Sequence, residues 1–354
     1  MSRPTVMPLP AVVGQERVKR GLLMLAANPR LGGMLIRGEK GTGKSTLARG
    51  LARLLPAARV VEGCRFGCLV DAPRTWCHEC RERTSVPAAV ERPPPFETLP
   101  LGITEDQLLG TLDLERALRE GERAFEPGLL ARVNHGVLYV DEVNLLEDHI
   151  VDLLLDVTVS GVNVVAREGV STEHPAGFLL IGTMNPEEGE LRPQLLDRFG
   201  LCVEIGHLPD PEDRAQVVER CLAFEADPEA FCDRWRGEER RLVEQIQRAR
   251  ELLPSVAVNR GFIMDAARLS LELGADGHRP DLLLIKGAMT LCALSGRGAL
   301  SPGDLELAAP LVYSHRVRRR PLEERSVDAE EIERRVREVC AGRAGPGGVE
   351  KKKS

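Results

Sequence analysis

The most constraining feature of this 354-residue chain is a glycine-rich segment between an apolar run and a helical pattern. Residues 34–37 read as a short buried strand, and leucines at helical spacing follow from residue 47 onward. Between them, residues 38–45 form a complete G-x-x-x-x-G-K-[ST] phosphate-binding loop. In such a loop, backbone N–H groups and the N-terminus of the following helix bind phosphate oxygens. The sequence therefore predicts a nucleoside triphosphate site.

The residues of this loop have distinct expected roles. Lys44 is expected to reach the β- and γ-phosphates, and the Ser45 hydroxyl is expected to ligate the magnesium ion of MgATP. The expected ATP-binding residues of the loop are Gly38, Glu39, Lys40, Gly41, Thr42, Gly43, Lys44, Ser45 and Thr46.

A second motif supplies carboxylates. The apolar run 137–140 is followed directly by Asp141 and Glu142. Asp141 at the end of a buried strand is expected to hold magnesium through water, and Glu142 is expected to polarise the attacking water as general base. Alternatively, the acidic pair serves only to cap a helix expected over 145–157.

A polar residue follows the next expected strand, 178–182. In a parallel sheet, Asn185 would lie beside the acidic pair, where its amide could orient the attacking water and sense the γ-phosphate. The alternative is a plain Asn-Pro turn.

Two arginines are candidates for contacts with the γ-phosphate. Arg198 lies near the far end of a short helix that begins at Pro193, pointing away from its own nucleotide, so it would neutralise transition-state charge in a neighbouring subunit. A surface salt bridge is the alternative. Arg279, just before an expected helix of the second domain, could fold over the γ-phosphate; alternatively it has no such role. Arg192 is the weaker candidate for the finger.

Charge and hydropathy exclude several classes of function. The net charge is −6 and aromatic residues make up only 3%, so no nucleic-acid partner is expected. The expected hairpin 162–175 offers only Arg167 against Glu168 and Glu173. No apolar run approaches the roughly 18 residues of a membrane span. The first ten residues contain three prolines and no apolar signal core, which predicts a cytoplasmic protein.

The order of expected elements indicates an α/β fold. Strands alternating with helices over residues 1–206 predict a parallel sheet covered by helices. This domain would include an irregular cysteine-rich segment, 61–95, and an insertion, 96–130, with a short extended piece and a charged helix near 113–122. Residues 207–340 are expected to form an all-helical domain, and 341–354 a flexible tail. The expected helices of the all-helical domain are 210–223, 238–253, 260–273, 281–294 and 302–311.

Four of the nine cysteines are clustered in sequence as Cys64-x3-Cys68-x8-Cys77-x2-Cys80. Two close pairs flanking a short loop suit a tetrahedral zinc ion, which would stabilise a loop too polar to form its own core. His78 could replace one ligand. Redox-sensitive thiols and unliganded cysteines remain alternatives.

Four longer runs resemble one protein family. They are LPLGITED over 99–106, AFEPGLL over 124–130, LYVDEVNLL over 138–146 and NPEEGELRPQLLDRF over 185–199. Together with the phosphate loop they resemble an AAA+ ATPase, and more narrowly the ATPase (I) subunit of magnesium chelatase. The resemblance runs from about residue 13 to 321 and implies a P-loop AAA+ domain followed by a helical lid. The cysteine quartet is a departure, because the family's ATPase pattern does not require it.

The resemblance implies a ring, expected to be hexameric, with ATP between protomers. Glu142, Asn185 and Arg198 would be its catalytic residues, and Arg279 a second sensor. The subunit would drive a D-type AAA+ partner, which acts on an H-type porphyrin-binding subunit that receives Mg2+ or Co2+ in chlorophyll or cobalamin biosynthesis. The insertion 96–130 and the hairpin near 161–177 would protrude and contact partners or neighbours. The alternative is a chaperone-like AAA+ ATPase that remodels another protein and has no part in tetrapyrrole synthesis.

Overall fold

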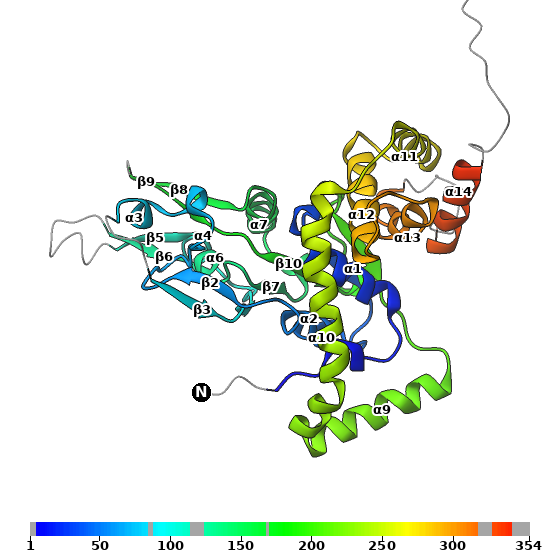
Figure 1. Ribbon diagram of the computed structural model, residues 1–354, viewed down its shortest axis with the longest axis horizontal. Coiled ribbons are helices and arrows are strands. Elements are labelled where there is room, and N and C mark those ends of the chain that lie inside the picture. Colours follow the sequence, from blue (N-terminus) through cyan, green and yellow to red (C-terminus); the bar gives the residue numbers. More distant parts are fainter. Residues whose placement is uncertain (1–4, 84–87, 114–123, 168–169, 318–327, 342–354) are drawn as a thin grey trace, which may run out of the picture. The chain divides into compact units, whose positions relative to one another are not determined.

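The computed structural model describes residues 5–83, 88–113, 124–167, 170–317 and 328–341 (Figure 1). It separates into two compact units, Met1–Gln247 and Arg248–Ser354. The expected boundary after residue 206 follows the change from mixed to helical structure. By packing, however, the first unit also includes helix α9 (Pro211–Ala226) and most of helix α10 (Pro228–Leu252).

The first unit is built on a parallel five-stranded sheet, as predicted. Its order is β11-β1-β10-β7-β4. Strand β10 therefore lies between β1, which precedes the phosphate loop, and β7, which precedes the acidic pair. The carboxyl ends of these three strands are neighbours at one edge of the sheet. The strands are β1 (Met34–Arg37), β4 (Phe96–Thr98), β7 (Val137–Val140), β10 (Leu179–Met184) and β11 (Leu201–Glu204).

The edge strand β4 corrects one expectation. Phe96–Thr98 was expected to be an extended piece of an insertion, but it pairs with β7 in the central sheet. The ring of Phe96 stacks on the ring of Tyr139 with centroids 5.9 Å apart, and this contact explains why so short a segment joins the sheet. Strands β7 and β10 are buried throughout, in keeping with their nearly continuous apolar sequences.

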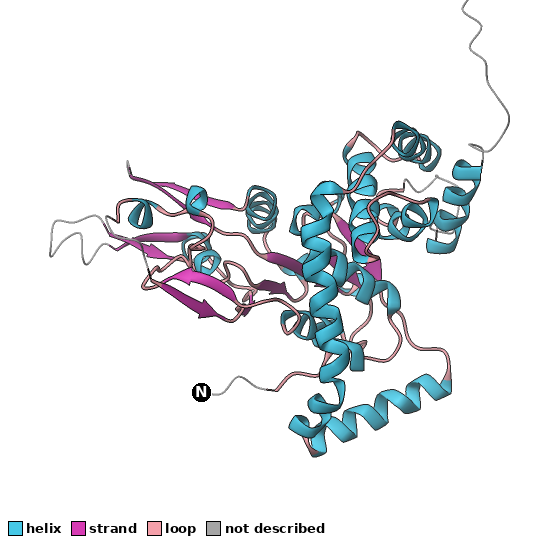
Figure 2. Cartoon of the chain, viewed as in Figure 1, coloured by secondary structure: helices cyan, strands magenta, loops and turns pink. Residues whose placement is uncertain are grey.

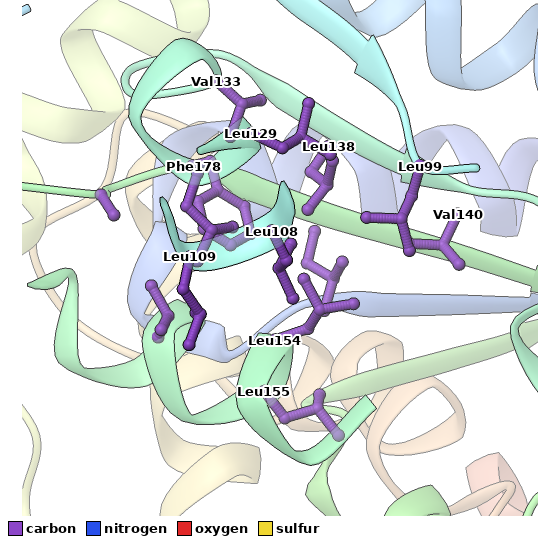
Figure 3. Packing of buried hydrophobic residues seen from close by; sticks show 14 of the residues in the cluster. Leu99, Leu108, Leu109, Leu129, Val133, Leu138, Val140, Leu154, Leu155 and Phe178 are labelled. Carbon is purple, nitrogen blue, oxygen red and sulfur yellow. The ribbon is translucent and has the colours of Figure 1, made fainter. Parts of the chain in front are cut away.

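Helices α1 and α2 contact each other, and α1 also contacts β1 and β11. Helix α7 contacts α8 and β10. Figure 3 shows part of the core, a cluster that includes leucines of α7, Leu138 and Val140 of β7, and Phe178. The helices of this part are α1 (Glu16–Ala27), α2 (Lys44–Ala52), α3 (His78–Arg81), α4 (Glu105–Leu109), α6 (Leu129–Arg132), α7 (Asp148–Ser160) and α8 (Pro193–Arg198). Short 3-10 helices are η1 (Leu9–Ala11), η2 (Pro29–Leu31), η3 (Pro73–Thr75), η4 (Val143–Leu145), η5 (Pro186–Glu188) and η6 (Leu253–Ser255).

Three antiparallel two-stranded ribbons accompany the central sheet, and Figure 2 shows them gathered together. The ribbon β8–β9 confirms the expected hairpin. The ribbon β2–β3 shows that the segment 61–95 is more regular than expected, since β3 and α3 lie within it. The expected charged helix near 113–122 lies almost entirely outside the described residues. The ribbon strands are β2 (Ala58–Val61), β3 (Ala89–Arg92), β5 (Gly110–Asp113), β6 (Ala124–Pro127), β8 (Val162–Arg167) and β9 (Val170–Pro175).

Helix α10 begins ten residues earlier than expected, at Pro228. It is tied to the end of α2, because the Arg53 guanidinium donates hydrogen bonds of 2.7 and 2.8 Å to the Glu239 carboxylate. In the second unit the described elements after α10 are the helices α11 (Arg260–Leu273), α12 (Arg279–Leu294), α13 (Pro302–Tyr313) and α14 (Ala329–Ala341), together with η6. Within the described residues, no helix is long and apolar enough to cross a membrane.

Candidate nucleotide site

The phosphate loop joins β1 to α2, as predicted. Gly41 and Gly43 have φ angles of +81° and +84°, a backbone conformation that side chains disfavour. No atom lies within 4 Å of the position that a Cβ would take on either residue. A side chain there would therefore be strained and would also project into the open cradle of the loop. The loop is shaped to receive phosphate groups.

The Lys44 ammonium lies inside this cradle. Its Nζ donates hydrogen bonds to the carbonyl oxygens of Gly38 at 2.5 Å and Glu39 at 2.8 Å. Burial lowers the pKa of Lys44, while Asp141 and Glu142 act in the opposite direction. The positive charge is thus held at the mouth of the loop and faces the acidic pair.

Asp141 is oriented by two hydroxyl groups that the sequence analysis did not identify. Its Oδ1 accepts hydrogen bonds from the Tyr139 hydroxyl at 2.9 Å and the Thr183 hydroxyl at 2.7 Å. Tyr139 lies in β7 and precedes Asp141 by two residues, a spacing that strand periodicity places on one side of an extended chain. Thr183 comes from the neighbouring strand β10, so only the sheet order reveals it. Burial raises the pKa of the Tyr139 phenol, which keeps it a donor.

Glu142 has an unusual backbone, with φ 53° and ψ 55° in the left-handed region. Its N–H donates to the Thr183 hydroxyl at 3.3 Å, and its Oε1 lies 3.6 Å from the Lys40 ammonium. Lys40 also pairs with Glu188 at 2.5 Å. The helix-cap alternative for the acidic pair is wrong. Helix α7 begins only at Asp148, and the Glu142 side chain makes no capping hydrogen bond to η4.

Asn185 follows β10 and is almost fully buried. Its Oδ1 accepts the Glu187 N–H at 3.2 Å, so the side chain forms the Asn-Pro turn that was the alternative interpretation. The same residue also lines the cavity described next, at the predicted position beside the acidic pair.

A cavity of about 430 Å3 is lined jointly by the phosphate loop and by the ends of β7 and β10. It brings together Lys44, Ser45, Asp141, Glu142 and Asn185, as the sequence predicted. The donor set fits MgATP, since ammonium and N–H groups suit phosphates, and hydroxyl and carboxylate oxygens suit Mg2+. Glu39 of the loop does not line this cavity, and its side chain pairs with His207 at 2.7 Å.

A second cavity of about 920 Å3 shares Gly41, Thr42, Gly43 and Thr46 with the loop. Its remaining lining is mostly apolar and suits a nucleoside base. No sequence pattern marks these residues, because they come from three separate segments, the N-terminal stretch, the turn after β11 and helix α9. They include Val12, Val13, Leu208, Val217, Val218 and Phe224.

The candidate arginines of the first unit, Arg198 and Arg192, line neither cavity. Arg198 forms ion pairs with Asp152 and Asp156 of α7 and does not line either cavity. Within a single chain its contacts are therefore those of the salt-bridge alternative. Arg192 pairs with Asp148 at 2.6 Å. Arg279 opens helix α12 of the second unit.

The four clustered cysteines meet in space. Their sulfur atoms all lie within 4.8 Å of one another, and three of the four residues are buried. Burial raises the pKa of the Cys80 thiol to about 12. His78 is not part of this group, because its side chain is exposed and pairs with Glu82 at 3.3 Å.

Comparisons with known proteins agree with this geometry. A family model described as "Magnesium chelatase, subunit ChlI" matches residues 111–194, and an AAA lid domain model matches residues 263–336. A magnesium-chelatase 38 kDa subunit of Cereibacter sphaeroides is 49% identical over 94% of this chain and 98% of its own. The corresponding subunit of Acidiphilium rubrum is 52% identical over 90% of this chain and 92% of its own.

Solved structures show the same relationship. A model of the BchI–BchD complex of magnesium chelatase, based on a cryo-EM reconstruction, contains a chain that is 47% identical. The match has a TM-score of 0.54 and covers 90% of this chain and 98% of the other. A putative ATPase of Cytophaga hutchinsonii, 18% identical, shares the fold with a TM-score of 0.62 over 93% of this chain and 91% of its own. These relatives favour the chelatase interpretation over a chaperone-like ATPase. The chain belongs to the magnesium-chelatase ChlI family and is an AAA+ ATPase subunit of that chelatase family.

Proposed function

We propose that this chain hydrolyses MgATP in the 430 Å3 cavity and uses the energy to drive metal insertion into a tetrapyrrole by partner subunits. The observation that carries the proposal is the shared lining of that cavity by the phosphate loop and two strand ends. A bound Mg2+ would neutralise charge on the phosphates. Lys44 binds the β- and γ-phosphates, Ser45 and Asp141 hold the metal, and Asn185 orients the attacking water.

Glu142 accepts the proton of that water. Its carboxylate is bounded by Lys40 on one side, 3.6 Å away, and its backbone is fixed by Thr183. A carboxylate that lines the cavity beside the phosphate loop can serve as a general base. The left-handed backbone at this position costs on the order of 1–3 kcal/mol, a strain that is common at functional sites.

The active unit is a ring, proposed to be hexameric, in which Arg198 acts on the nucleotide of the neighbouring copy. Among the described residues, the smaller cavity is lined by lysines but by no arginine. An arginine that stabilises transition-state charge must therefore come from another element or another chain. Arg198 is the proposed finger in trans, and Arg279 the proposed second sensor from the lid.

The partners are proposed by analogy with the relatives. One related structure contains BchI together with BchD, which supports a D-type AAA+ partner for this chain. An H-type subunit would bind the porphyrin and receive Mg2+, with Co2+ as the other candidate metal. The proposed compartment is the cytoplasm.

A reconstituted chelation assay tests this function. The chain is combined with candidate D-type and H-type subunits, porphyrin, ATP and either Mg2+ or Co2+, and metalloporphyrin is measured by its absorbance. Lys44→Ala is the matched negative control, because it removes the phosphate-binding charge. Metal insertion that proceeds equally well with Lys44→Ala would refute the proposal, as would failure of every D-type subunit to bind the chain.

The ion proposed to bind to the cysteine quartet is a structural zinc ion. Its support is the convergence of four sulfur atoms in a largely buried setting, which matches the thiolate preference of tetrahedral zinc.

A further inference from the structure

The sulfur positions fit one ion rather than a disulfide. The Sγ atoms of Cys64 and Cys77 are 3.9 Å apart, and all four sulfurs lie within 4.8 Å of one another. Four thiolates at about 2.3 Å from a zinc ion would stand about 3.8 Å apart. A disulfide would require about 2.05 Å. The backbone N–H of Cys77 also donates to the Cys68 sulfur at 3.1 Å.

The cysteine loop, residues 64–81, contacts the ribbon β5–β6. Arg65, the residue after Cys64, donates from Nη1 to the carbonyl oxygen of Phe125 in β6 at 2.8 Å. Its other terminal nitrogen forms an ion pair with Glu79 of α3, between Cys77 and Cys80. One guanidinium thus links both halves of the cysteine loop to β6.

The same loop contacts the ribbon β8–β9. Arg81, the residue after Cys80, pairs with Glu173 of β9 at 2.7 Å. Phe66 lies between Cys64 and Cys68, and its ring stacks on the buried ring of His174 with centroids 4.7 Å apart and planes 22° apart. The Phe66 ring also faces that of Phe125 at 6.3 Å. Phe66 is therefore shared by both ribbons.

Besides the cysteines, backbone hydrogen bonds and one amide side chain hold the ends of this loop. Val61 N–H donates to the Cys68 carbonyl oxygen at 2.8 Å, and the Asn134 side chain donates to the Phe66 carbonyl oxygen at 2.8 Å. Between Cys68 and Cys77, residues such as Asp71 and Arg74 are exposed. The indole of Trp76 makes one hydrogen bond, to the Leu69 carbonyl at 2.6 Å. Without a metal, these contacts and three buried thiols alone would have to offset the entropy of ordering the segment.

We infer that zinc bound by the cysteine quartet makes residues 64–81 a rigid platform that positions both ribbons, β5–β6 and β8–β9, independently of the phosphate loop. This inference rests on the proposed zinc site and adds a role for it. Metal loss should release the ribbons, because Phe66, Arg65 and Arg81 are each within two residues of a metal ligand. The nucleotide cavities contain none of these residues.

The first experiment measures metal. Full-length protein, purified under reducing conditions, is analysed by mass spectrometry for zinc and iron. The expected result is about one zinc per chain, lost in Cys68→Ser and retained in Cys340→Ser, a control cysteine in α14. A zinc content near zero would overturn the site, whether the thiols prove free or oxidised in a thiol titration.

The second experiment measures the ribbons by hydrogen–deuterium exchange before and after a zinc-selective chelator. The expected result is exchange about tenfold faster in β6 and in β8–β9, with β1, α2 and nucleotide binding unchanged. Phe66→Ala should retain zinc yet loosen both ribbons. Unchanged hydrogen exchange in the ribbons after metal removal would overturn the platform, even if the first experiment had established zinc binding. Simultaneous loss of nucleotide binding would show that the platform is not independent of the phosphate loop. A failed chelation assay alone would contradict only the proposed function.

Discussion

Replacing Thr183 with valine tests how β10 contributes to the acidic pair on β7. The Thr183 hydroxyl is fully buried and donates to Asp141 at 2.7 Å while accepting the Glu142 N–H at 3.3 Å. Valine keeps the shape but removes both contacts. A hydrogen bond to a charged group contributes about 1.5–3 kcal/mol, and loss of a residue that orients a metal ligand typically costs about 10- to 100-fold. We expect the Mg2+ concentration for half-maximal ATPase activity to rise by about that factor.

The assay is a Mg2+ titration of ATP hydrolysis at saturating ATP. Thr183→Ser restores a hydroxyl and should recover most of the Mg2+ affinity. Thr158→Val is the matched control, because the Thr158 hydroxyl is also buried but donates to the Leu154 carbonyl in α7 at 2.7 Å. A normal Mg2+ dependence in Thr183→Val would refute the reasoning. An equal defect in Thr158→Val would assign the effect to general destabilisation.

Three further variants probe the proposed roles. Glu142→Gln should bind ATP with near-normal affinity but hydrolyse it about 10²- to 10⁴-fold more slowly in single-turnover assays, because the general base is lost. Arg198→Ala should bind ATP and lose about 10³-fold or more in hydrolysis, and mixing it with Glu142→Gln should restore part of the activity, since each copy supplies what the other lacks. Arg53→Ala should lower the unfolding free energy by about 1–3 kcal/mol in thermal melts, because it leaves the Glu239 carboxylate buried without its partner.

Each of these expectations has a contrary outcome. Rapid turnover by Glu142→Gln would exclude that carboxylate as the base. Mixed rings with no recovered activity would count against a site shared between copies. For Arg53→Ala, the double variant with Glu239→Gln should be less destabilised than the single variant, and equal destabilisation would show that the ion pair is not the cause.

The strands that form the nucleotide site were predictable because their sequences are unambiguous. Strands β1, β7 and β10 are apolar runs that end in a glycine-rich loop, an acidic pair and an asparagine. Strand β4 was not predictable in the same way, since three residues carry no periodicity and only pairing with β7 makes them a strand. Sheet order lies beyond local sequence, and for that reason the Thr183–Asp141 contact was missed.

For the cysteine quartet, too, the sequence predicted the group of residues but not its tertiary contacts. Spacing alone indicated that the four thiols could meet. It did not reveal that Arg65, Phe66 and Arg81, adjacent in sequence to the ligands, would each contact a ribbon far along the chain. Such contacts depend on tertiary packing, which local patterns do not encode. The apolar cavity beside the phosphate loop was missed for a related reason, because only tertiary packing brings together the three segments that line it.

The left-handed backbone at Glu142 has a practical consequence for anyone choosing an inactive version of this protein. Asparagine and aspartate adopt that conformation several-fold more readily than most residues, and glycine adopts it freely, whereas valine, isoleucine and threonine resist it. A branched replacement would therefore disturb the turn into η4 along with the chemistry. In a library of all twenty residues at this position, the yield of folded protein should follow how readily each residue adopts the left-handed backbone. The rate of ATP hydrolysis should instead depend on whether the residue carries a carboxylate.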